Sequence, residues 1–122
     1  MRSMSDGRPV TVRESEQAFV VVISGEIDVD AVGELDEAMA RAWRASAAVT
    51  VLDLSGTVFA DSSLLNLLLE AQERYSTEGR LLAVAGPFHP AVTRLFQVTG
   101  TADYLPLAED VDAAVRQGDP SH

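Results

Sequence analysis

Cysteine is absent from the sequence. Its absence excludes a disulfide framework, thiolate zinc sites and cysteine nucleophiles. The N-terminal residues also lack the apolar segment of a signal peptide, and no apolar run approaches the length of a membrane span. We therefore expect a cytoplasmic protein that does not bind membranes.

Basic residues are scarce: 9 Lys plus Arg stand against 19 Asp plus Glu, which gives a formal net charge of −10. The basic residues are spread along the chain and form no cluster. Such a surface repels phosphate backbones and anionic lipid, so direct nucleic-acid binding is not expected. A protein partner with a basic patch suits it better.

Motifs of catalysis are also missing. The chain has no glycine-rich phosphate-binding loop and no His or Cys spacing for a metal. A serine hydrolase would need Ser62 within a G-x-S-x-G elbow, but its neighbours are Asp61 and Ser63. His89 precedes a proline at a helix start, and Asp28 and Asp61, two acids at loop ends, are better explained as cap or turn residues than as metal ligands. We predict no catalytic residue, metal or cofactor.

Length and periodicity predict one domain, because 122 residues suffice for a single core. Apolar runs predict strands at 10–14, 18–23, 49–54, 81–85 and 104–107. Helical spacings predict helices with an N-cap at Asp30, with a start at Asp61-Ser62-Ser63, and over 90–99 and 109–116. Loops or turns are predicted at 24–28 and 55–57, and tails at 1–9 and 118–122.

The order of these elements indicates the fold class. Strands that alternate with helices require crossover connections, which produce a largely parallel sheet. We therefore predict an α/β domain over residues 10–117. It should contain a largely parallel sheet of four to five strands with about four helices packed on it.

The stretch Asp61-Ser62-Ser63 lies where the second helix begins. Helix starts leave backbone N–H groups unpaired, and Asp and Ser are residue types that satisfy them. A serine hydroxyl at the positive end of a helix dipole is also suited to carry a phosphate. From these residues alone, a cap and a phosphate acceptor are both possible.

Four short motifs, in order, resemble the STAS domain of bacterial anti-sigma factor antagonists. They are Gly25-Glu26-Ile27-Asp28, Leu52-Asp53-Leu54, Phe59-Ala60-Asp61-Ser62-Ser63, and Pro90-Ala91-Val92-Thr93-Arg94-Leu95-Phe96 with Thr99-Gly100. The resemblance covers about residues 10 to 117. It implies the STAS fold, a mixed β-sheet with helices on it, which agrees with the predicted element order.

The resemblance also implies a phosphorylation switch. In that family an anti-sigma factor that is itself a serine kinase, using ATP and magnesium, phosphorylates the first serine after the aspartate, here Ser62. The unphosphorylated antagonist binds the anti-sigma factor and frees a sigma factor, and a phosphatase reverses the modification. Asp28 and Asp61 match acidic residues near the acceptor. Ser63 is the alternative acceptor, and Asp28, Asp61, Ser62, Ser63 and Leu64 are the expected partner contacts.

One residue departs from the family pattern. The family usually has glycine after the two hydroxyl residues, whereas this chain has Leu64. Leucine restricts the backbone there, and its side chain either packs inward or is exposed to a partner. The departure motivates an alternative function: a STAS scaffold without phosphorylation, or the small cytoplasmic subunit of a transporter. An exposed apolar helix face could also support a homodimer.

Overall fold

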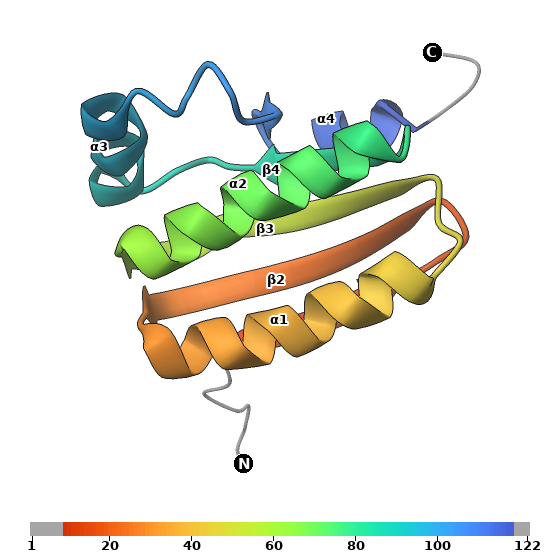
Figure 1. Cartoon of the computed structure of the whole chain (residues 1–122), viewed down its shortest axis with the longest axis horizontal. Helices are drawn as coiled ribbons and strands as arrows, with labels where there is room; N and C mark the ends of the chain where they lie inside the picture. Colours follow the sequence, from red (N-terminus) through yellow and green to blue (C-terminus); the bar gives the residue numbers. More distant parts are fainter. Residues whose placement is uncertain (1–8, 119–122) are drawn as a thin grey trace.

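The structure is a computed structural model that describes residues 9–118. Residues 1–8 and 119–122, which make up most of the two predicted tails, lie outside the described residues. The chain forms one five-stranded sheet and four helices within the described part (Figure 1). The predicted α/β class is therefore confirmed.

The strands follow one another across the sheet in the order β1-β2-β3-β4-β5. They are β1 (Val10–Glu14), β2 (Ala18–Ile27), β3 (Val49–Ala60), β4 (Leu81–Ala85) and β5 (Leu107–Ala108). β1 pairs with β2 in the antiparallel sense, and every later pair is parallel. The helices are α1 (Val29–Arg44), α2 (Ser62–Thr77), α3 (Pro90–Thr99) and α4 (Val111–Arg116).

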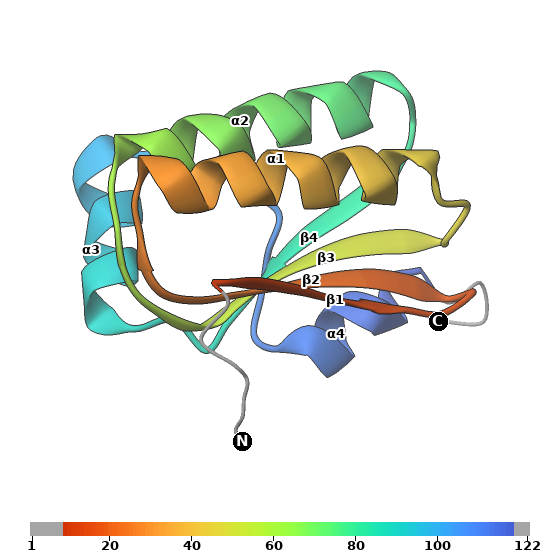
Figure 2. The ribbon, with the colours of Figure 1, turned by 90° about the horizontal axis from the view of Figure 1, so that it is seen from below.

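The two faces of the sheet are covered unequally. Figure 2 shows α1 and α2 side by side over one face, α4 on the opposite face and α3 beyond one end of the sheet. Side chains alternate along a strand, so Val21 and Ile23 join the larger core beneath α1 and α2, while Val20 joins the smaller core beneath α4. The two cores therefore bury both faces of the sheet.

β2 and β3 are longer than the sequence predicted, which corrects the loop at 24–28 and the turn at 55–57. The polar ends of the two strands pair with each other, Gly25 with Thr57 and Ile27 with Ala60, through two register shifts. Sequence periodicity does not predict this extension, because polar residues and bulges interrupt the apolar pattern there. Parallel pairing therefore continues to the residues just before α1 and α2.

Gly56 lies close to the side chain of Ser24 on the paired strand. A Cβ atom at position 56 would lie 2.7 Å from the Ser24 Oγ, so a larger residue there would require the Ser24 side chain to move. The neighbouring Thr57 is fully buried, and its hydroxyl donates a 2.7 Å hydrogen bond to the Ile23 carbonyl. The glycine thus marks a tight strand contact rather than a turn.

Two helix starts also differ from the predictions. Asp28, not Asp30, is the N-cap of α1, because the extended pairing of β2 places the strand end immediately before it. α4 begins at Val111, with Asp110 as its N-cap, two residues later than predicted. The start of α2 and the bounds of α3 agree with the predictions, and Gly100 follows α3 in a left-handed conformation.

The buried hydrogen bond from the Thr57 hydroxyl to the Ile23 carbonyl should stabilise the paired ends of β2 and β3. Thr57→Val keeps the side-chain shape but leaves the buried Ile23 carbonyl without this donor, so we expect a loss of about 1–2 kcal/mol in the free energy of unfolding. Urea unfolding followed by the fluorescence of Trp43, the single tryptophan, measures it. Thr11→Val, at an exposed position of β1, is the control. Equal stability of the two variants would contradict the prediction.

Candidate functional site

Two helix starts lie next to each other at one end of the sheet. Ile27 and Ala60 are partners in the parallel pairing of β2 and β3, and Asp28 and Asp61 follow them directly. α1 and α2 therefore begin at the same end of the sheet, where β2 and β3 finish, and run in the same direction (Figure 1). The candidate site is defined here as Asp28, Val29, Phe59, Asp61, Ser62 and Ser63.

Both aspartates cap the helix that follows them. The Asp28 Oδ1 accepts hydrogen bonds from the backbone N–H groups of Asp30 and Ala31, each at 3.1 Å. The Asp61 Oδ1 accepts a 2.9 Å hydrogen bond from the backbone N–H of Ser63. Both carboxylates thus satisfy backbone donors and place negative charge at the positive ends of two helix dipoles.

The two serines have different environments. Ser62 is exposed and is the first residue of α2, so it lies at the positive end of the helix dipole and directly follows the capping residue Asp61. Ser63 is half-buried, and its backbone N–H is the donor to the cap. Because Asp61 performs the capping, the Ser62 hydroxyl is accessible to a partner and Ser63 is less so.

Leu64 is 1% exposed and belongs to the large core beneath α1 and α2. This burial corrects the expectation that its side chain contacts a partner: of the two possibilities, inward packing is the one found. α2 nevertheless starts normally, with Asp61 in an extended conformation and a regular cap. A leucine in place of glycine is therefore compatible with an ordinary helix start.

Two exposed apolar side chains in the site were not predicted from the sequence. Val29, the first residue of α1, is 70% exposed, and Phe59, one residue before the end of β3, is 54% exposed. The bulged pairing of β3 leaves Val58 and Phe59 both exposed, which a strictly alternating strand would not do. Exposed apolar groups beside a polar centre are typical of protein-binding surfaces.

His89 has a structural contact of its own. Its Nδ1 accepts a 3.1 Å hydrogen bond from the backbone N–H of Ala91, so the imidazole caps α3.

Across residues 9–118, no group of three or more His, Asp or Glu residues is placed to hold a metal ion. No helix in that same range is long and apolar enough to cross a membrane.

A family model described as "Mlab, STAS domain" matches residues 10–116. The chain belongs to the STAS domain family. This confirms the family suggested by the four sequence motifs and the fold that they implied. A comparison with curated proteins finds no match.

Solved structures of anti-sigma factor antagonists share this fold. One from Mycobacterium paratuberculosis is 29% identical, with a TM-score of 0.77 over 88% of this chain and 91% of that one. The antagonist SpoIIAA in its unphosphorylated form is 20% identical, with a TM-score of 0.72 over 88% and 95%. The Bacillus protein SpoIIAA in its phosphorylated form is 18% identical, with a TM-score of 0.67 over 88% and 98%.

The capping role of Asp61 can be separated from its charge. Asp61→Ala removes the acceptor for the Ser63 N–H and should lower the free energy of unfolding by about 1 kcal/mol. Asp61→Asn keeps a side-chain oxygen and should stay within about 0.5 kcal/mol of the unsubstituted protein, since Asn caps as well as Asp. Urea unfolding of both variants tests this. If Asp61→Asn is as unstable as Asp61→Ala, charge rather than hydrogen bonding stabilises the helix start.

Proposed function

We propose that this protein is an anti-sigma factor antagonist that is switched by phosphorylation of Ser62. Unphosphorylated, it binds an anti-sigma factor serine kinase in the cytoplasm and so releases a sigma factor. The observation that carries the proposal is an exposed serine at the first position of a capped helix in a STAS domain. The resemblance to a solved antagonist at 29% identity supports the same role.

In this proposal the chain is a binding protein and a phosphate acceptor rather than an enzyme. The kinase supplies ATP and magnesium, and this chain supplies only the Ser62 hydroxyl. The accessible hydroxyl attacks the γ-phosphorus of ATP, the bond to the β,γ-bridging oxygen breaks, and ADP leaves as the hydroxyl proton is lost. A phosphatase later hydrolyses the phosphoserine and restores the binding form.

Charge explains how one phosphate could end binding without changing the fold. Phosphorylation adds about −1.5 to −2 charges, and the N-terminus of α2 tolerates anionic oxygens. Asp28 and Asp61 cap the two adjacent helices, so the added charge increases an already negative end of the sheet. A loss of about 3 kcal/mol in binding free energy corresponds to a roughly hundredfold weaker complex. That magnitude is sufficient for a switch.

The alternative, a STAS scaffold or transporter subunit without phosphorylation, was motivated by Leu64. Because Leu64 is buried and the helix start is regular, this residue gives no steric reason against a kinase at Ser62. The phosphorylation switch is therefore the better-supported proposal. Recovery of membrane transport subunits, without any anti-sigma factor, from a pull-down would favour the alternative.

Phosphorylation should occur at Ser62 alone. Incubation with a cognate anti-sigma kinase, ATP and magnesium should add one phosphate, which mass spectrometry of peptides places at Ser62. Ser62→Ala should abolish the addition and bind the kinase persistently, whereas Ser62→Asp should bind about a hundredfold more weakly, as measured by calorimetry.

Ser63→Ala is the matched control for the phosphorylation experiment and should still be modified. Phosphate found at Ser63, or an unchanged affinity of Ser62→Asp for the kinase, would contradict the proposed switch.

Phe59 should contribute to partner binding. Phe59→Ala removes an exposed aromatic side chain of the candidate site, so we expect kinase binding to weaken by about 1–2 kcal/mol, within the range of interface residues. The free energy of unfolding should change little, because the ring is 54% exposed. Tyr104→Ala, at a 72% exposed aromatic outside the candidate site, is the control. Equal effects of the two substitutions on affinity would argue against a contact at Phe59.

A further inference from the structure

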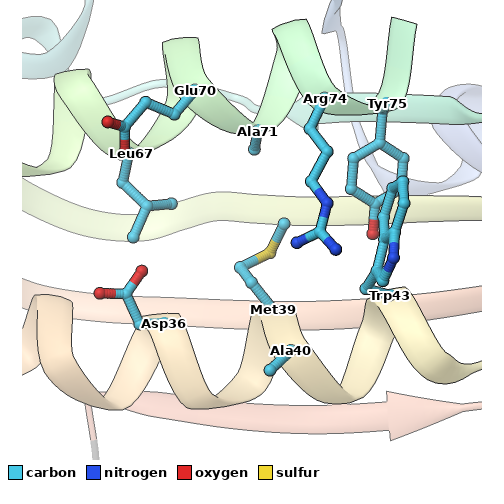
Figure 3. Close-up of a pocket in the computed structure, with 9 residues that line it drawn as sticks. All are labelled: Asp36, Met39, Ala40, Trp43, Leu67, Glu70, Ala71, Arg74 and Tyr75. Atoms are coloured by element: carbon cyan, nitrogen blue, oxygen red, sulfur yellow. The ribbon is translucent and has the colours of Figure 1, made fainter. Parts of the chain in front are cut away.

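A groove of about 190 Å³ lies between α1 and α2 (Figure 3). Asp36, Met39 and Trp43 line it from α1, and Leu67, Glu70 and Arg74 line it from α2. We refer to it as the α1–α2 groove. It is separate from the candidate site at the helix starts and has no part in the proposed phosphorylation.

The two ends of the groove differ in charge. The carboxylates of Asp36 and Glu70 lie on opposite walls toward one end, with Leu67 between them (Figure 3). At the other end, the Arg74 guanidinium lies 3.9 Å from the centre of the Trp43 ring. Met39 occupies the middle. A cation is therefore attracted to the Asp36 and Glu70 end and repelled from the Arg74 end.

The volume of the groove indicates the size of its occupant. Cofactor and drug-sized ligands occupy cavities of about 300–1,000 Å³, so a groove of about 190 Å³ is too small for them. It is large enough for one long side chain. Lysine and arginine lay an apolar stem along apolar surface and keep the charged head at a polar edge, which matches Met39 and Leu67 beside two carboxylates.

The Trp43 and Tyr75 end of the groove is held in place by contacts within the chain. Arg80 donates hydrogen bonds to the backbone carbonyls of Trp43 at 2.7 Å and Ala45 at 3.0 Å, which fixes the end of α1. The Tyr75 hydroxyl donates to the Thr50 Oγ1 at 3.1 Å, and the Trp43 and Tyr75 rings pack edge to face. A preformed groove requires little ordering when a partner binds.

We propose that the α1–α2 groove docks a partner protein through one of its arginine or lysine side chains. The charged head contacts Asp36 and Glu70, and the stem lies over Met39 and Leu67. A second copy of this chain is the less suitable occupant, because each copy carries a net charge of −10 and presents the same acidic groove. The docking does not depend on Ser62, which lies about 12 Å from Glu70 along the axis of α2.

Nuclear magnetic resonance tests the proposal with a defined probe. The ¹⁵N-labelled full chain is titrated with a helical 16-residue peptide that carries one arginine within a leucine stripe, and with the same peptide containing neutral citrulline instead. We expect amide shifts at residues 36–43 and 67–74, with about tenfold tighter binding of the arginine peptide. The Asp36→Asn/Glu70→Gln variant should bind the two peptides equally.

Glu34→Gln/Glu73→Gln is the matched control, because it changes the charge of the same two helices by the same amount outside the groove. It should retain the preference for arginine, and so should Ser62→Asp. Equal binding of both peptides, shifts at other residues, or an equal loss in the control variant would overturn the proposal. Shifts of the same amides on dilution of the free protein would show instead that a second copy covers the groove.

Discussion

The parallel pairing of the ends of β2 and β3 is the constraint on which the candidate site depends. The two strands are joined beyond their apolar segments by a close contact between Gly56 and Ser24, and by the buried hydrogen bond from Thr57 to the Ile23 carbonyl. This pairing brings Ile27 beside Ala60, so the residues that start α1 and α2 begin at the same level. A slip of one residue would turn the side chains of the strand to the opposite face and separate the two caps.

Once the helix starts are aligned, the roles at Asp61-Ser62-Ser63 divide. In the sequence, a cap and a phosphate acceptor compete for the same three residues. In the structure, the Asp61 carboxylate accepts from the backbone of Ser63, and Ser62 takes the first helical position with an exposed side chain. The Asp61 carboxylate therefore caps the helix, and the Ser62 side chain stays exposed on the surface of α2. The two interpretations are compatible because they fall on different residues.

The sequence predicted the fold well, because the strand and helix periods are strong in its apolar segments. It did not predict where β2 and β3 end, since Ser24, Gly56 and Thr57 resemble turn residues until the pairing between the strands is known. The N-cap at Asp28 was missed for the same reason, and Asp30 has an equally plausible local pattern. Local sequence identifies residue types that suit a boundary, whereas tertiary pairing selects among them.

The site was predictable in part. The short motifs that resemble the STAS family singled out Asp28, Asp61 and Ser62, and the structure places these three residues together at the starts of α1 and α2. The burial of Leu64 and the exposure of Val29 depend on how each helix is rotated against the sheet, which no short motif contains. The α1–α2 groove depends on how the two helices are rotated relative to each other. In the sequence, Asp36 and Glu70 therefore look like any other exposed acidic residues, and nothing indicates that they line one groove.

We expect phosphorylation of Ser62 and docking of a cationic side chain in the α1–α2 groove to be independent of each other, for an electrostatic reason. Surface charges are screened over about 8 Å at physiological ionic strength, and about 12 Å of helix separates Ser62 from Glu70. A phosphate at Ser62 therefore acts strongly on a partner that covers the helix starts and only weakly on a cation in the groove. The helix dipole favours that phosphate by about 0.3–1 kcal/mol, so the fold itself does not oppose the modification. One rigid pair of helices can in this way present one surface that phosphorylation changes and another that it leaves unchanged.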